Sequence, residues 1–272
     1  MENKKSNAGL IVLIIILILM VMCLGGYIVY DKFLSDTFKP KETKKEIKKE
    51  EKLVSKVNDS KDWVYDAVYE KDVTADSYST GYYTYYAKDI VVPYININST
   101  FAKRSNDEIK TVFDKAIEAY NEGVNNQMTY IKDCNYTKYE DKDMLSVFFQ
   151  LGVGATDIVQ PDYYTYNIDL KTGKELSYEE VYKKAGFTKE NIESKAVESI
   201  TKFVNDTYFN NELAKQMDTE KYVYSTIDNY KESVLDNSIK YYLSKEGNLN
   251  VIVKVMIPAG KGEHTHTIEI SK

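Results

Sequence analysis

An uninterrupted apolar run near the start of the chain is the feature that most constrains what it can fold into. No charged residue occurs between Ser6 and Tyr30, and residues 8–29 are almost wholly apolar. At about 1.5 Å of rise per residue, roughly 20 such residues cross the ~30 Å hydrocarbon core of a bilayer. We therefore expect residues 8–30 to form a single transmembrane helix.

Two kinds of cleaved leader are the alternatives to an anchor. A secretory signal has an apolar region of about 7–15 residues that ends in small residues. This run is longer and lacks such an ending. A lipoprotein signal needs a small residue before its cysteine, but Met22 precedes Cys23. The sequence thus favours an uncleaved signal-anchor that contacts the lipid bilayer through residues 8–30 and places the protein in the cell membrane.

The orientation of this anchor follows from the charges beside it. Lys4 and Lys5 precede the span, whereas seven lysines lie between residues 32 and 49. A simple count of positive charges would keep the C-terminal side in the cytoplasm. Only Lys32 lies close to the span, however, and large domains translocate largely regardless of charge. We expect residues 1–7 to form a short cytoplasmic head and the domain after the anchor to be extracytoplasmic.

The rest of the chain divides by charge into a stalk and a domain. Residues 31–60 are rich in Lys and Glu and predict a solvated spacer. Residues 1–60 hold 11 Lys and 8 acidic residues, net +3, whereas residues 61–272 hold 25 basic and 34 acidic residues, net −9. An acidic domain argues against nucleic acid as a partner and suits a basic protein.

Four segments of the domain carry helical patterns. Apolar residues recur with helical spacing from Ile109 to Val124, behind a capping box that begins at Ser105 and ends at Glu108. A second capping box, Ser177-Tyr178-Glu179-Glu180, predicts a short helix through Lys184. Two further amphipathic patterns cover residues 192–208 and 227–235.

Strand patterns fill most of the remaining domain. They are rich in β-branched and aromatic residues and are separated by turn residues. They cover residues 63–69, 82–86, 90–95, 135–139, 144–151, 163–170, 238–243, 249–257 and 264–270. Strands in hairpins between helices, without strict βαβ alternation, predict an α+β fold in which antiparallel sheets pack against amphipathic helices. We expect residues 61–272 to form one domain, or two joined lobes of about 61–130 and 131–272.

One part of this pattern resembles a known family. Residues 166–176 read Tyr-Asn-Ile-Asp-Leu-Lys-Thr-Gly-Lys-Glu-Leu and lead into a capped short helix. This turn is similar to one in a bacterial extracytoplasmic α+β module. That module forms the outer domain of RsiV-type anti-sigma-V factors, which sense lysozyme, and precedes the catalytic domain of PdaC-type peptidoglycan deacetylases. Residues 147–156 and 257–260 resemble its strand that ends in Gly-Gly-Ala-His and its final strand boundary.

The resemblance covers roughly residues 75–271 and implies a function. Val153 and Thr156 stand where the module has a Gly and the His, so any ligand site at that strand end is in doubt. The head before the anchor is too short to fold into an anti-sigma segment. We therefore expect the outer module alone: a membrane-anchored binding or sensing module for a cell-envelope ligand, such as peptidoglycan, or a secreted protein, such as lysozyme.

An enzyme is the alternative, and it depends on two histidines. His264 and His266 lie two residues apart, so in a strand both imidazoles face the same side and could hold one metal ion. Glu263 or Glu269 could add a third ligand, which would give a metal-assisted cell-envelope hydrolase. A solvated Thr/His face is the simpler interpretation, so we expect no catalytic residue, cofactor or resident metal. Cys134, the lone thiol outside the span, is expected to be a small buried residue.

Overall fold

The computed structural model describes residues 53–67, 77–79, 84–87, 90–126, 130–154, 161–210, 219–257 and 262–272. All of them lie in a compact unit that spans Glu51–Lys272. The predicted head at residues 1–7, the anchor at residues 8–30 and most of the stalk lie outside the described residues. None of the helices within the described ranges is both long and apolar enough to cross a membrane.

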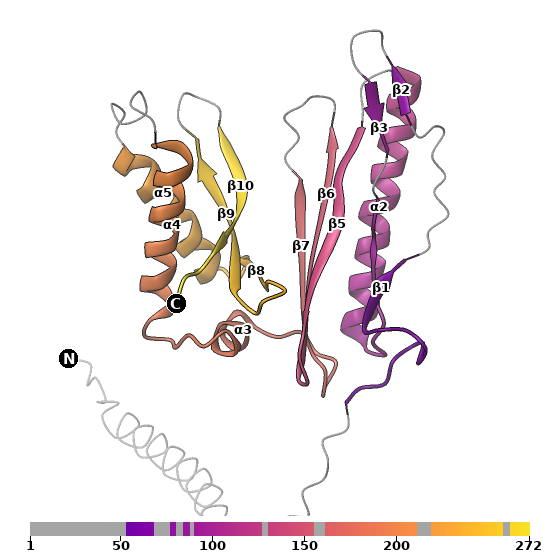
Figure 1. Ribbon diagram of the computed structural model, residues 1–272, viewed down its shortest axis with the longest axis horizontal. Helices are drawn as coiled ribbons and strands as arrows, with labels where there is room; N and C mark the ends of the chain where they lie inside the picture. Colours follow the sequence, from indigo (N-terminus) through magenta and orange to yellow (C-terminus); the bar gives the residue numbers. More distant parts are fainter. Residues whose placement is uncertain are drawn as a thin grey trace, which may run out of the picture. The chain divides into compact units, whose positions relative to one another are not determined.

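The described part of the chain has an α+β fold with antiparallel sheets, as the sequence predicts (Figure 1). Its helices are α2 (Thr100–Asn126), α3 (Tyr178–Lys184), α4 (Ile192–Tyr208) and α5 (Thr219–Leu235). Its strands are β1 (Val64–Asp66), β2 (Ser77–Ser79), β3 (Thr84–Tyr86), β4 (Pro93–Ile95), β5 (Tyr130–Glu140), β6 (Met144–Gly154), β7 (Asp162–Asp169), β8 (Lys240–Leu243), β9 (Leu249–Met256) and β10 (Glu263–Glu269).

A first hydrophobic core lies between α2 and the sheet β5-β6-β7. The central strand β6 turns Leu145, Val147 and Phe149 toward this core, and all three are fully buried. They pack with the apolar stripe of α2, whose members include Ile109 and Phe113. The predicted hairpin between β5 and β6 is confirmed by their antiparallel pairing.

Helix α2 begins earlier than the sequence predicts. Ser99 is its N-cap, because the Ser99 Oγ accepts a hydrogen bond of 3.1 Å from the N–H of Ala102. Ser105 lies inside the helix instead, where its hydroxyl donates to the carbonyl of Phe101 at 3.0 Å. The predicted capping box at Ser105 was therefore wrong: a residue that can cap a helix can also bond back to the preceding turn.

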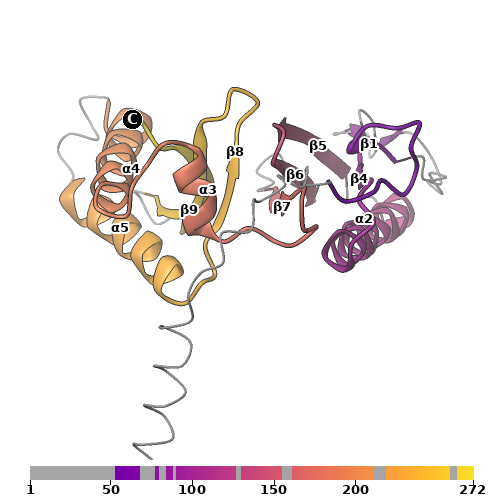
Figure 2. The ribbon, with the colours of Figure 1, turned by 90° about the horizontal axis from the view of Figure 1, so that it is seen from below.

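A second core lies between helices α3, α4 and α5 and the sheet β10-β9-β8 (Figures 1 and 2). Strand β9 contributes Val251, Val253 and Val255, which are all buried. The capping box predicted for α3 is confirmed, since the Ser177 hydroxyl accepts from the N–H of Glu180 while the Glu180 carboxylate accepts from the N–H of Ser177.

The two cores divide the chain near residue 170, whereas the sequence suggested lobes of 61–130 and 131–272. Leu170 is the last residue of the first core, and Leu176 is the first residue after it in the second. Strands β5 to β7 join the first core because their aliphatic residues face α2. Met144 of β6 is the exception, since it packs in the second core.

A polar seam joins the two sheets along the outer edge of β8. Leu243 N–H donates to the Ser146 Oγ at 2.9 Å, and the Asn167 Nδ2 donates to the carbonyl of Tyr241 at 2.8 Å. The Ser146 hydroxyl also donates to the Asn167 Oδ1 at 2.6 Å. These side chains satisfy one carbonyl and one N–H that the edge strand β8 would otherwise leave unpaired.

Candidate functional site

The two histidines lie together on β10, on the face that packs against α4. Their ring centroids are 6.4 Å apart, and the His266 ring lies 5.3 Å from that of Phe203. The His266 Nε2 is 2.6 Å from the hydroxyl of Tyr208. Burial lowers the pKa of His266, and the neighbouring His264 lowers it further. His266 is therefore a neutral packing residue at neutral pH, with its Nε2 engaged by Tyr208.

The described residues do not supply a third ligand for these histidines. No group of three or more His, Cys, Asp or Glu within them is placed to hold a metal ion. Glu263 and Glu269, the predicted candidates, lie at odd positions of β10 and so project from the opposite face to His264 and His266. Cys134 is 2% exposed and lies in the first core, as expected for a small apolar residue.

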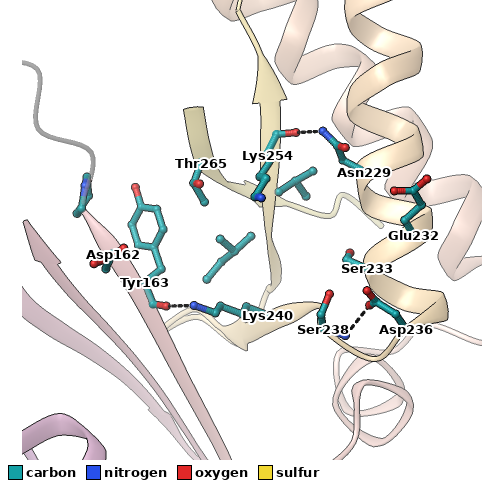
Figure 3. A pocket seen from close by; sticks show the side chains of 13 residues that line it. Asp162, Tyr163, Asn229, Glu232, Ser233, Asp236, Ser238, Lys240, Lys254 and Thr265 are labelled. Atoms are coloured by element: carbon teal, nitrogen blue, oxygen red, sulfur yellow. Dashed lines mark hydrogen bonds between the residues drawn. The ribbon is translucent and has the colours of Figure 1, made fainter. Parts of the chain in front are cut away.

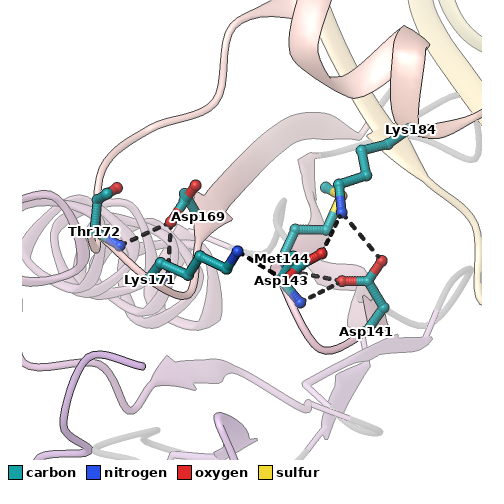
Figure 4. A network of polar contacts seen from close by, with 7 residues as sticks. All are labelled: Asp141, Asp143, Met144, Asp169, Lys171, Thr172 and Lys184. Atoms are coloured by element: carbon teal, nitrogen blue, oxygen red, sulfur yellow. Dashed lines mark hydrogen bonds and ion pairs between the residues drawn. The ribbon is translucent and has the colours of Figure 1, made fainter. Parts of the chain in front are cut away.

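A charged network connects the β5–β6 turn to the segment after β7 (Figure 4). The Lys184 Nζ lies 3.2 Å from the Asp143 Oδ2 and 3.6 Å from the Asp141 Oδ2, and the Lys171 Nζ lies 3.5 Å from the Asp143 Oδ1. Asp169 closes the next turn by accepting 2.7 Å hydrogen bonds from the N–H groups of Lys171 and Thr172.

Two carboxylates of this network, those of Asp141 and Asp143, have lowered pKa values. The hydrogen bond from Lys184 lowers the pKa of Asp143. Partial burial opposes ionisation of Asp141, but hydrogen bonds from the N–H groups of Asp143 and Met144, with the charge of Lys184, lower its pKa on balance. Each charged group faces a partner within the network, so the network fastens α3 to the first sheet and leaves little capacity for a ligand.

A polar pocket of about 310 Å³ opens beside the seam (Figure 3). Its walls come from elements that pack in different cores. Asp162 lies at the start of β7, which belongs to the first core. Glu232 lies in the last turn of α5, which belongs to the second core, and Asp236 directly follows that helix. Lys240 of β8 and Lys254 of β9 complete its charged lining. Figure 3 shows Asp162 on one side of the opening and Glu232 and Asp236 on the other.

Hydrogen bonds set the shape of this pocket. The Lys240 Nζ donates to the carbonyl of Tyr163 at 2.7 Å, which bridges β8 and β7. The Asn229 Nδ2 donates to the carbonyl of Lys254 at 3.0 Å, which holds α5 against β9. Hydrogen bonds from Ser238 lower the pKa of Asp236, so its carboxylate is ionised. The pocket thus presents carboxylates that can pair with an ammonium or guanidinium group.

A second, larger pocket of about 530 Å³ is lined by tyrosines of the second core. Tyr178 and Tyr230 hydrogen bond through their hydroxyls at 3.1 Å, and Tyr182 packs edge-on against Tyr178. Burial raises the pKa of Tyr178 and of Tyr230, so both are neutral. These side chains pack the pocket wall and cannot serve as bases at neutral pH.

No protein-family model matches this chain, and no curated protein matches it in sequence. The polar pocket was not predicted from the sequence. Its charged residues Asp162, Glu232, Asp236, Lys240 and Lys254 come from separate elements, and none belongs to a recognisable motif. The only local signals were turn and cap residues, such as Asp236 beside Ser238.

Proposed function

We propose that this protein is a membrane-anchored extracytoplasmic binding or sensing module for a cell-envelope ligand or a secreted protein such as lysozyme. The observation that carries the proposal is the polar pocket, where carboxylates from both cores surround one opening. A ligand seated there would contact β7 of the first core and α5 of the second at once. Binding could therefore alter how the two cores are held together.

The charge of the domain supports a cationic ligand. Residues 61–272 carry net −9, and the pocket adds three carboxylates against two lysines, one of which already donates to the backbone of β7. A basic protein would be attracted over a distance and then held by pairing with Asp162 and Glu232. The resemblance of residues 166–176 to a turn of the lysozyme-sensing module supports the same ligand class.

Direct contact with a ligand is tested by measuring binding of hen lysozyme and of soluble peptidoglycan fragments to the full chain in detergent micelles. The double variant Asp162→Asn with Glu232→Gln should weaken binding about tenfold, because two charge-assisted contacts are lost. The matched control replaces two exposed acids of α2, Glu118→Gln with Glu122→Gln, and should leave binding near the wild-type value. The proposal would be overturned if the wild-type chain bound neither lysozyme nor the peptidoglycan fragments at low salt.

The anchor is supported by the apolar run at residues 8–30 and is tested separately. Protease treatment of intact protoplasts should degrade residues 61–272 and leave a small membrane-protected fragment. Complete protection of the domain until the cells are lysed would reverse the orientation, and an extracytoplasmic ligand would then be excluded.

A further inference from the structure

Strand β10 forms an edge of the sheet β10-β9-β8, and half of its backbone groups face outward. The N–H of Ile270 bonds to the carbonyl of Leu249, so even-numbered residues of this strand point their backbone toward β9. Thr265 and Thr267 therefore direct their N–H and carbonyl groups away from the sheet. Within the described part of the chain these four groups have no hydrogen-bond partner.

The opposite edge of the same sheet is treated differently. There the outward carbonyl of Tyr241 accepts a hydrogen bond from Asn167, and the outward N–H of Leu243 donates one to Ser146. Just beyond β10, the N–H of Ser271 bonds to the Ser199 Oγ of α4. Side chains thus bond the outward carbonyl of Tyr241 and the outward N–H groups of Leu243 and Ser271. Among the described residues, the outward groups of Thr265 and Thr267 have no such partner. Edge strands are usually protected by charged residues, especially Lys, by Pro or by a bulge. Strand β10 contains neither Lys nor Pro, and its exposed charges are Glu263 and Glu269 at its two ends.

Charges at the ends of β10 indicate what could pair with it. Glu263 and Glu269 are exposed, lie six residues apart and project from the same face as Thr265 and Thr267. If two copies of β10 paired antiparallel over their full length, Glu263 of each would lie opposite Glu269 of the other. Like charges directly opposite are destabilising, so this edge disfavours a second copy and favours a strand with basic residues.

We propose that β10 is a docking edge for an extended segment of a partner protein that carries Lys or Arg at two positions six residues apart. The segment adds a fourth strand to the sheet: its backbone pairs with Thr265 and Thr267, and its basic residues pair with Glu263 and Glu269. Main-chain hydrogen bonds supply the affinity of such strand addition, and the side-chain pairs supply its specificity.

A short labelled peptide, Lys-Val-Thr-Val-Thr-Val-Lys, tests this with the full chain in detergent micelles. In the paired strand its two threonines turn their N–H groups toward β10, whereas the valines turn theirs away. N-methylation of both threonines should weaken binding at least about tenfold, since two backbone hydrogen bonds are lost. N-methylation of the first and central valines is the control and should leave binding unchanged.

Variants of the protein test the same pairing from the other side. Thr267→Pro removes an outward N–H and should weaken peptide binding about tenfold, whereas Thr267→Val, which also lacks the hydroxyl, should bind like wild type. If Thr267→Pro does not fold, the double variant Glu263→Lys with Glu269→Lys tests the pairing instead. It should no longer bind the basic peptide and should bind a peptide in which both lysines are replaced by glutamates.

Three results would overturn the proposal: no saturable binding of the basic peptide to the wild-type chain, equal binding of the threonine-methylated peptide, or unchanged charge preference in the double glutamate variant. A dimer in sedimentation that Thr267→Pro dissociates would show instead that a second copy occupies this edge.

The double variant Asp162→Asn with Glu232→Gln should bind the peptide normally, so failure of the pocket proposal and failure of this one are distinguishable.

Discussion

Removal of the Ser146 hydroxyl should be among the most damaging small changes to this protein. Ser146 is fully buried, and its Oγ both accepts from the N–H of Leu243 at 2.9 Å and donates to the Asn167 Oδ1 at 2.6 Å. Ser146→Ala leaves both of these groups without a partner in a buried seam. Each orphaned group costs about 1–3 kcal/mol, so we expect a loss of about 2–4 kcal/mol in the free energy of unfolding.

Urea denaturation of residues 51–272 measures this loss. With a slope of about 2 kcal/mol per molar urea, the midpoint should fall by about 1–2 M. Amide exchange gives a local measurement, because the N–H of Leu243 should exchange faster in the variant. Ser233→Ala is the matched control: its hydroxyl donates only to the helical carbonyl of Tyr230 at 2.7 Å, so its loss should cost about 0.5 kcal/mol or less.

The reasoning would be refuted if Ser146→Ala stayed within about 0.5 kcal/mol of wild type, since the cost of an unsatisfied buried donor alone exceeds that value. It would also be refuted if the control lost as much stability as Ser146→Ala. In either case the seam would not hold the two sheets together, and the coupling between cores assumed for the sensing function would lack its physical basis.

Three further predictions follow from groups outside the seam. The pKa of Asp143 is lowered in the folded state, so its contribution to stability is present above the unfolded pKa of about 3.9 and is lost as the pH falls through the folded pKa. Asp143→Asn should therefore lower the urea midpoint at pH 7. It should leave the midpoint unchanged at a pH below the folded pKa, where Asp143 is protonated. NMR titration should place the pKa of His266 below 6.5, and His264→Ala should raise it only part of the way back, because burial is the larger cause. Gly173→Ala should lower the melting temperature more than Gly262→Ala: both glycines have positive φ, but a Cβ at Gly173 would lie 2.6 Å from the Cβ of the serine that caps α2, whereas at Gly262 it would meet open space.

Elements with strong local signals could be predicted from the sequence. Helix α3 follows from the reciprocal cap of Ser177 and Glu180, which needs only neighbouring residues to form. Helix α4 matches the amphipathic pattern of residues 192–208 at both ends. The hairpins β5–β6 and β8–β9 follow from charged or glycine-containing turns between apolar strands. Each of these features depends on the conformational propensities and hydrogen bonds of a few neighbouring residues, which can be read directly from the sequence.

The position at which helix α2 begins was determined by tertiary contacts, not by the local sequence signal. The sequence predicted the cap of α2 at Ser105 because Glu108 completes a capping box there, whereas the structure places it at Ser99. In the folded protein the helix continues back to Thr100, which lets Phe101 and Ala102 pack in the first core. Burial of these residues favours the longer helix over the shorter one, and a serine inside it bonds to the previous turn at small cost.

Only the tertiary structure determined the seam, the polar pocket and the open edge. Ser146 and Asn167 occupy strand positions that alternate with core residues, and such positions usually face water. They became buried because β8 lies against that face. Asp162 of β7 and Glu232 of α5 line the same pocket although 70 positions separate them in the sequence. Contacts between residues 70 or more positions apart depend on how the sheets pack, and no local pattern of residues encodes that packing.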